Sequence, residues 1–453
     1  MQKDDDAICA LSTPVGKGAI GLIRVSGKDC HQLVQNCLYH KKPPGRSMAR
    51  NFFFDPTNQE TLDEIMVVFF TSPASFTGQD SVELTFHGGG YILRKALSIL
   101  YSQGVRAAEP GEFTRRAFLN GKIDLSRAEG IHDLIEAQSQ EQWQAARVLT
   151  SGRLQKIIEA LRENLLKALA YLEAQIDFPD EKETEDLDFK LVDGFVLDLM
   201  ASISKLKAGY DSGRVAANGM QVVIWGRPNV GKSTLLNRLL DYERALVSDQ
   251  PGTTRDYLEE SCLLAGRLFR FVDTAGIRKT SSQIEAMGIE ASERLVTKAD
   301  LVLLLATADS SEEYKAMQED AFPLEPQANH ILRVWTKKDL YPCPEPLKAK
   351  GWLEIAAIDS ISTLKDRLVA IMDERLGSFH ADQEGISNAR HLDCLTKAFA
   401  NLERYNELRK DGGYEELLAF ELQEANRHLS SIIGAISGDE ILDQVFSTFC
   451  LGK

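Results

Sequence analysis

The chain has 453 residues, enough for two or three domains, and its formal net charge of −15 argues against a surface that binds nucleic-acid phosphates over a broad area. Its seven scattered cysteines form no C-x-x-C pair, which argues against a zinc site and favours reduced thiols. The longest apolar run, near 301–306, is far shorter than the roughly 18 residues of a membrane span, and residues 1–6 lack a signal-peptide pattern, so we expect a cytoplasmic protein without a membrane partner.

Residues 1–119 are predicted to form a mixed α/β region. Strand-like apolar runs occupy 19–25, 64–70 and 82–86, and helical periodicity occupies 28–38 and 91–103. Composition alone favours reading the segments 75–80 and 87–90, on either side of the strand at 82–86, and the segment 110–122 as turns between these elements, with His87 as a turn or capping residue.

A helical pattern begins near residue 124. Apolar residues recur at steps of three and four from Leu154 to Ile176, which predicts a long amphipathic helix that ends before Pro179. The acidic stretch 181–188 is interpreted as a solvated loop, and a second helix is predicted over 189–212. Helical periodicity returns over 392–405 and 417–436, after a polar linker at 378–388. We therefore expect one helical domain built from 120–216 and 379–453, with residues 217–378 inserted into it.

The inserted segment begins with a phosphate-binding motif. Residues 222–234 have the sequence VVIWGRPNVGKST, an apolar strand followed by the G-x-x-x-x-G-K-[ST] spacing of a P-loop. Gly226 and Gly231 allow a tight turn that directs backbone N–H groups at phosphate oxygens. Lys232 is expected to reach the β- and γ-phosphates and Ser233 to bind Mg²⁺, at the N-terminal end of a helix that favours anions.

Further motifs indicate GTP rather than ATP. The apolar strand at 269–272 ends in Asp273, a carboxylate expected to hold Mg²⁺ through water. Segment 331–339, ILRVWTKKD, ends in an N/T-K-x-D guanine motif, in which Asp339 can accept hydrogen bonds from guanine N1–H and N2–H₂. Segment 251–256 resembles switch I, with Thr254 as the second direct Mg²⁺ ligand. The usual Ser-Ala base loop is degraded to Ala356 and Ala357.

These motifs define the predicted nucleotide site. The predicted GTP-binding residues are Asn229, Val230, Gly231, Lys232, Ser233, Thr234, Ser248, Thr253, Thr254, Asp273, Thr274, Ala275, Gly276, Thr336, Lys337, Asp339, Ala356 and Ala357.

Over essentially its full length, the chain resembles the MnmE (TrmE) family of bacterial tRNA-modification GTPases. The resemblance rests on segments 21–27, 75–78, 87–89, 110–113, 118–122 and 176–181, the GTPase motifs and the terminal FCLGK. It implies an N-terminal α/β folate-binding domain that dimerises (1–119), a discontinuous α-helical domain and an inserted Ras-like P-loop G domain with a doubly wound sheet.

The same resemblance implies ligands and partners. 5-Formyltetrahydrofolate or a related folate would contact Arg24, Glu83, Lys122 and Lys453. An FAD-containing partner, MnmG, would supply most of the tRNA-binding surface. Together the two proteins would install an aminomethyl or carboxymethylaminomethyl group at C5 of the wobble uridine (position 34) of certain tRNAs. Cys450, in the terminal FCLGK, is interpreted as a structural thiol.

The device for GTP hydrolysis is expected to be unusual. Ile277 occupies the position where many GTPases carry the glutamine that orients the attacking water. The resemblance implies that Glu285 orients this water and acts as a catalytic residue together with Lys232. It also implies a K⁺ ion that supplies positive charge at the phosphates when two G domains meet. The residues implied to bind K⁺ are Asn229, Ser248, Gln250 and Thr253.

Two alternative functions stay open at this point. A ribosome-assembly GTPase would have a related G domain, but it predicts a basic RNA-binding module beside that domain, and the flanking segments are not basic. A non-catalytic, GTP-gated scaffold would leave all modification chemistry to the partner. Folate bound at Arg24, Glu83 and Lys122 would argue against the scaffold.

Overall fold

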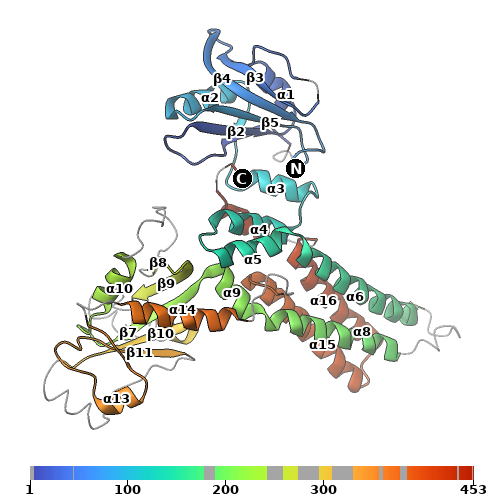
Figure 1. Cartoon of the computed structure of the whole chain (residues 1–453). Helices are drawn as coiled ribbons and strands as arrows, with labels where there is room; N and C mark the ends of the chain where they lie inside the picture. Colours follow the sequence, from blue (N-terminus) through green and yellow to red (C-terminus); the bar gives the residue numbers. More distant parts are fainter. Residues whose placement is uncertain are drawn as a thin grey trace, which may run out of the picture. The chain divides into compact units, whose positions relative to one another are not determined.

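A computed structural model describes residues 5–43, 45–177, 189–241, 259–273, 295–308, 330–356, 361–377, 385–435, 438–450 and 452–453. Several predicted site residues lie outside these ranges, namely Ser248, Gln250, Thr253, Thr254, Thr274, Ala275, Gly276, Glu285 and Ala357. The chain divides into two compact units (Figure 1). Unit 1 comprises 1–132, 148–199 and 394–453, and unit 2 comprises 133–147 and 200–393.

Unit 1 contains a six-stranded sheet in the order β3-β4-β5-β2-β1-β6. Its strands are β1 (Ile8–Leu11), β2 (Ile20–Ser26), β3 (Met48–Asp55), β4 (Glu60–Phe70), β5 (Ser81–His87) and β6 (Arg106–Ala107). Only β1 and β6 pair in parallel. Helices α1 (Cys30–Gln35) and α2 (Gly90–Ser102) bury alternate strand residues in one core, where Val34 and Ile99 join Phe53 and Phe86.

Most predicted elements of this sheet region are confirmed, with two differences. Strands near 19–25, 64–70 and 82–86 and the helix near 91–103 are present, whereas β1, β3 and β6 were not predicted. Helix α1 is shorter than the predicted 28–38, because Asp29 has a left-handed φ of 59° and the helix begins only at Cys30. The prediction that 110–122 forms only turns is wrong, since α3 (Glu112–Leu119) lies within it.

The remaining helices of unit 1 include the predicted long one. Helix α6 (Arg153–Asp177) packs on α16 (Glu415–Ile433) and buries the predicted stripe at Leu154, Leu165 and Leu172. Helix α16 ends before Gly434, whose φ of 78° is a left-handed cap. Helix α17 (Asp439–Ser447) packs on α3.

Four further described helices cross the division between the units: α4 (Leu125–Glu136), α5 (Gln140–Thr150), α8 (Phe189–Ala208) and α15 (Ala389–Lys410). The single helix predicted over 189–212 is wrong, because α8 ends at Ala208 and α9 (Tyr210–Asn218) begins after Gly209. Glycine is a poor helix former, and the Ser212 hydroxyl donates to the Gly209 carbonyl at this junction.

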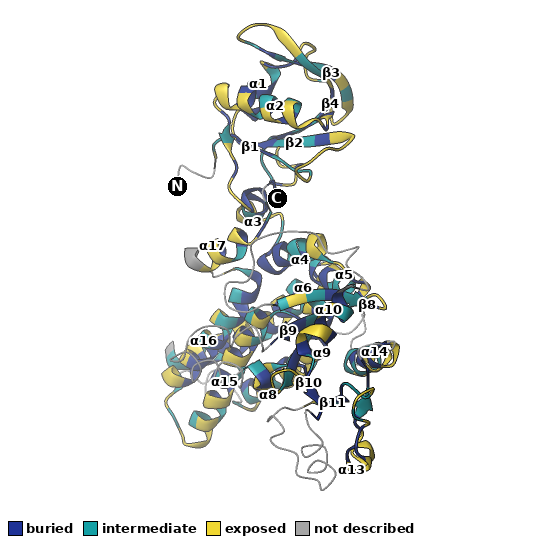
Figure 2. Cartoon of the chain, turned by 90° about the vertical axis from the view of Figure 1, so that its left-hand side faces the viewer, coloured by how far each residue is buried: buried dark blue, intermediate teal, exposed yellow. Residues whose placement is uncertain are grey.

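Unit 2 contains the second sheet, in the order β12-β11-β10-β7-β9-β8. Its strands are β7 (Met220–Gly226), β8 (Glu259–Leu264), β9 (Arg267–Asp273), β10 (Leu301–Ala306), β11 (Ile331–Trp335) and β12 (Leu353–Glu354). All neighbours are parallel except β8 and β9. Every residue of β10 is buried, as expected for a central strand covered on both faces (Figure 2).

Helices cover this sheet and complete a doubly wound fold. Helix α10 (Lys232–Asp241) and helix α14 (Ser362–Leu376) bury Leu239, Leu364 and Leu368 in a core with β7 and β10. The short α13 (Glu345–Ala349) contributes Leu347 to a core on β10 and β11. Parallel strands place their carboxyl ends at one edge, where such folds bind ligands. The fold class predicted from the sequence is therefore confirmed.

Candidate functional site

The P-loop connects β7 to α10 at the carboxyl edge of the second sheet. Gly226 has a φ of 156°, and a Cβ there would lie 2.4 Å from the carbonyl oxygen of Leu305 on β10, so only glycine fits. Asn229 and Gly231 also have positive φ values, 64° and 97°. Asparagine tolerates this conformation better than most residues. The loop thus turns tightly enough to face its N–H groups inward.

The lysine of the P-loop is held inside this turn. Its Nζ donates to the carbonyl oxygens of Gly226 and Arg227, each at 2.8 Å. The residue is only 7% exposed, so the ammonium group of Lys232 is positioned by the loop that it follows. Such a group can neutralise phosphate oxygens bound in the same loop.

Two oxygen donors meet beside the loop. The hydroxyl of Ser233, in the first turn of α10, donates to Asp273 Oδ2 at 3.1 Å. Asp273 ends β9 and lies in register with Ile224 of β7. A carboxylate and a hydroxyl in this position suit a hard cation such as Mg²⁺, which prefers oxygen ligands. The residues present therefore fit the metal that the motif predicts.

The guanine motif is bonded directly to the P-loop. Thr336 follows β11, and its Oγ1 donates to the Val230 carbonyl oxygen at 2.6 Å. Its backbone N–H donates to the carbonyl oxygen of Ala306 at 2.8 Å. Lys337 has a φ of 54°, and Asp339 is exposed. Thr336 is 6% exposed, which indicates that its side chain links the two loops.

The structure brings most of the described nucleotide-site residues to one edge. Thr234 is exposed on the first turn of α10. Ala356 is buried, and its carbonyl oxygen accepts from Arg238 of α10 at 3.4 Å. The backbone of the base loop is thus tied to the helix that follows the P-loop.

A second cluster lies in unit 1, on neighbouring strands. Arg24 of β2 and Glu83 of β5 are paired residues in the sheet. Arg24 donates to Glu83 Oε1 through Nε at 3.1 Å and through a terminal nitrogen at 2.9 Å. The rings of Phe76 and Phe113 lie 5.6 and 5.8 Å from the guanidinium carbon. The arginine is therefore oriented by a carboxylate and two aromatic rings.

The C-terminal residues complete this cluster. Gly452 has a φ of 91°, and a Cβ there would lie 2.4 Å from the Leu11 carbonyl oxygen. The Ser12 hydroxyl donates to the Gly452 carbonyl oxygen at 3.1 Å, and the Phe113 N–H donates to that of Lys453 at 3.2 Å. Burial and the nearby Arg24 lower the pKa of Lys453, whereas Glu83 acts in the opposite direction. Lys453 therefore lies within electrostatic range of the Arg24–Glu83 pair.

The fourth predicted folate residue lies on an adjoining loop. Lys122 Nζ donates to the Pro73 carbonyl oxygen at 2.9 Å, and Asn120 Nδ2 donates to that of Thr77 at 2.8 Å. Gly78 has a φ of 77°, and a Cβ there would lie 3.2 Å from Lys122 Cγ. The loop at 120–122 is thus hydrogen-bonded to the loop at 72–79, which carries Phe76.

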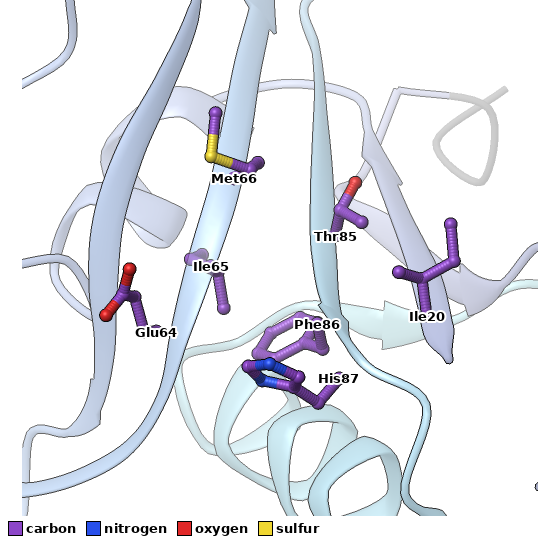
Figure 3. Close-up of a pocket in the computed structure, with 7 residues that line it drawn as sticks. All are labelled: Ile20, Glu64, Ile65, Met66, Thr85, Phe86 and His87. Carbon is purple, nitrogen blue, oxygen red and sulfur yellow. The ribbon is translucent and has the colours of Figure 1, made fainter. Parts of the chain in front are cut away.

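A separate pocket opens on the same sheet. It has a volume of about 220 Å³. It is lined by Ile20, Glu64, Ile65, Met66, Thr85, Phe86 and His87 (Figure 3). The Nδ1 of His87 lies 2.7 Å from Asp63 Oδ1, and this hydrogen bond raises the pKa of His87. None of the predicted folate residues lines this pocket.

Comparison with known proteins covers nearly the whole chain. Residues 125–450 match the family model described as the MnmE helical domain, and residues 7–122 match the model of the GTP-binding protein TrmE N-terminus. The tRNA modification GTPase MnmE of Moorella thermoacetica is 37% identical over 476 residues, covering 99% of this chain and 100% of that protein. That of Streptococcus thermophilus is 36% identical over 460 residues, covering 100% of both.

The chain belongs to the MnmE family of tRNA modification GTPases. Among solved structures, the G domain of the T. maritima FeoB iron transporter matches with 21% identity, covering 34% of this chain and 98% of that one, at a TM-score of 0.23. Membership of the MnmE family makes the chain a GTP hydrolase in tRNA modification, with GTP and Mg²⁺ as ligands. In the described part of the chain, no helix combines the length and apolar character needed to cross a membrane.

The sequence analysis missed an ion-pair network beneath the second cluster of this MnmE-family chain. Arg116 is fully buried, and one terminal nitrogen donates to Asp6 Oδ1 at 2.7 Å and to Glu112 Oε1 at 2.8 Å. Arg106 donates to the same two carboxylates. Burial acts to raise the pKa of Glu112, but hydrogen bonds, first that from Arg106, hold this pKa below its usual value. In the sequence, Glu112 and Arg116 fall within the segment 110–122, which was interpreted as turns.

Proposed function

We propose that this MnmE-family GTPase acts in the cytoplasm with an FAD-containing partner, MnmG, to install an aminomethyl or carboxymethylaminomethyl group at C5 of the wobble uridine of certain tRNAs. The proposal rests on the presence, in one chain, of two sites in which hydrogen bonds hold charged side chains in place. Unit 2 holds the P-loop lysine beside Ser233 and Asp273, and unit 1 holds Arg24, Glu83 and the C-terminal lysine. A simple GTP-dependent switch needs only the first site.

Nucleoside mass spectrometry of bulk tRNA tests this function. Cells that lack the protein are expected to lose a C5-aminomethyl-type uridine, which the wild-type chain restores and an Asp273→Ala chain does not. Removal of Asp273 takes away the carboxylate that accepts from Ser233 at 3.1 Å. An unchanged nucleoside profile in the deletion strain would contradict the substrate and bring the ribosome-assembly alternative forward.

We further propose that the unit 1 cluster binds 5-formyltetrahydrofolate or a related folate, the source of the one-carbon unit. Arg24, Lys122 and Lys453 would bind the ligand's carboxylates, and Glu83 would accept hydrogen bonds from the pterin edge. The Arg24–Glu83 pair and the half-buried terminal lysine support this assignment, because they place charged groups within electrostatic range of one another. Two copies of the chain would form the homodimer that the family resemblance implies.

Substituting Glu83 by glutamine tests the folate proposal. Affinity for 5-formyltetrahydrofolate, measured by isothermal titration calorimetry, is expected to fall at least about tenfold, since the charged acceptor is lost. Glu64→Gln is the matched control, because Glu64 also pairs with an arginine, Arg50, on this sheet. Equal folate affinity in both variants, with normal tRNA modification, would favour the scaffold alternative.

We also propose that Asn229 helps to bind a K⁺ ion, with Ser248, Gln250 and Thr253, and that Glu285 orients the attacking water. The exposed, left-handed position of Asn229 at the turn of the P-loop supports its part in this proposal. K⁺ would supply positive charge near the phosphates. Asn229→Ala is expected to abolish the stimulation of GTP turnover by K⁺ over Na⁺, whereas Asn237→Ala, on an exposed position of α10, should retain it. Full stimulation in both variants would exclude this role.

A further inference from the structure

A basic segment interrupts the acidic surface of the chain. The sequence holds 67 acidic and 52 basic residues in all, yet no Asp or Glu occurs between Asp29 and Asp55. Lys41, Lys42, Arg46 and Arg50 all fall in this interval. We call residues 39–50 the basic segment, of which residue 44 lies outside the described ranges. The net charge of the basic segment is positive, whereas that of the whole chain is −15.

The basic segment is a loop that runs into the first residues of β3, and its base is closed by hydrogen bonds. The His40 N–H donates to Asn51 Oδ1 at 3.0 Å, and Asn51 Nδ2 donates back to the His40 carbonyl oxygen at 2.9 Å. Asn51 is 1% exposed, so this clamp is part of the core. Beyond it, Leu38 bridges Phe53 of β3, the strand at the edge of the sheet. The loop is therefore held in place at the sheet edge and projects its side chains outward.

Three cations of the loop are free to bind an anion. Arg50 already pairs with Glu64. Lys41, Lys42 and Arg46 are exposed, and among the described residues no carboxylate lies within ion-pairing distance of them. Lys42 Nζ lies 3.0 Å from His31 Nδ1 and 5.4 Å from the centre of the Phe69 ring. In the described part of unit 1, no carboxylate therefore neutralises these three charges.

Aromatic rings accompany these cations. The guanidinium carbon of Arg46 lies 4.6 Å from the centre of the Phe70 ring, which orients it without a counter-charge. Tyr39, at the start of the basic segment, is 53% exposed, and its ring lies 4.7 Å from that of Phe54. Cations with an exposed aromatic ring are the combination by which proteins bind RNA phosphates and unstacked bases.

We propose that the basic segment is a contact surface for the phosphate backbone of the tRNA substrate. The proposal rests on the proposed function in tRNA modification, and it goes beyond the expectation from the sequence that MnmG supplies most of the tRNA-binding surface. A polyanion matches a surface whose three cations have no carboxylate partner among the residues that the structure describes. Contacts of this kind position an RNA without reading its sequence. The acidic remainder of the chain would then restrict the RNA to this surface.

The test compares two triple variants of the full-length chain with equal change in charge. Lys41→Ala, Lys42→Ala and Arg46→Ala together remove the proposed contacts. Lys156→Ala, Lys167→Ala and Lys410→Ala together remove three exposed lysines from the helices of unit 1. Binding of fluorescently labelled bulk tRNA is measured by anisotropy over a series of NaCl concentrations, with intrinsic GTP turnover measured in parallel.

The loop variant is expected to bind tRNA at least about tenfold more weakly at low salt, with a slope of log K against log salt smaller by about 2. The control variant and the GTP turnover of both should match the wild type. Equal affinity and slope in the two variants would overturn the proposal. So would normal tRNA binding together with loss of assembly with MnmG, which would make this a protein-binding surface. Failure of the proposed function would appear separately, as an unchanged nucleoside profile in the deletion strain.

Discussion

Replacing Lys232 by methionine is expected to lower GTP turnover by at least about 100-fold, the effect typical of losing one positioned charge on a transferring phosphoryl group. Methionine keeps the length of the side chain and removes the ammonium group. In the native loop this group donates to the carbonyl oxygens of Gly226 and Arg227, both at 2.8 Å. Single-turnover hydrolysis and nucleotide affinity would be measured on the full-length variant.

The controls for this prediction separate chemistry from folding. Lys348→Met removes an ammonium group that pairs with Glu345 on the surface of the same unit, and its turnover should equal that of the wild type. Lys232→Met also removes the two hydrogen bonds to the P-loop carbonyls, so the thermal midpoint of the variant must be measured as well. A folded Lys232→Met variant that turns over GTP within about threefold of the wild type would contradict the role of this lysine.

Replacing Asp339 by asparagine is expected to change which base is bound. The carboxylate can accept hydrogen bonds from guanine N1–H and N2–H₂, whereas an amide must turn one of its own donors toward them. A buried site binds a ligand about 100-fold or more weakly when their polar groups cannot pair with each other. The affinity of the variant for GTP should therefore fall by at least about 100-fold. Xanthosine triphosphate carries an oxygen at C2 and should bind the variant better than GTP does.

This reversal of preference is the diagnostic result, since damage to the fold would weaken both nucleotides. Thr336 bonds to the Val230 carbonyl at 2.6 Å, so the loop that precedes Asp339 is anchored to the P-loop independently of the substituted side chain. Asp366→Asn, on an exposed position of α14, is the matched control and should retain GTP preference. If Asp339→Asn binds GTP and the xanthine nucleotide as the wild type does, Asp339 is not the base-reading residue.

Much of the nucleotide site could be predicted because its chemistry is local. The residues from Gly226 to Ser233 are contiguous, and the strand before them and the helix after them have clear periodicity. The same holds for Asp273 and Thr336, each at the end of an apolar strand. Because strands and helices alternate along this part of the sequence, the strands were expected to pair in parallel. Parallel pairing places all three strand ends at one edge of the sheet.

Other features could not be predicted because no local signal carries them. The start of α1 depends on the left-handed backbone of Asp29, and the division of α8 from α9 depends on the junction at Gly209. Helix α3 occupies a stretch whose glycine and proline content favours turns. The buried Arg116 stabilises this helix through ion pairs with Asp6 and Glu112. Tertiary contacts outweigh weak local preference at such positions.

By itself, the sequence determined the family, the GTPase motifs and the fold class of the N-terminal region and of the G domain. These depend on the spacing and periodicity of residues along the chain. Only the tertiary structure decided how the C-terminal tail is held against the sheet, through a hydrogen bond between residues 440 positions apart, Ser12 and Gly452. It also decided that the chain before β3 forms a loop closed by the His40–Asn51 hydrogen bonds, with three exposed cations that have no carboxylate partner in the described ranges. Contacts between distant residues depend on how elements pack, which no local pattern encodes.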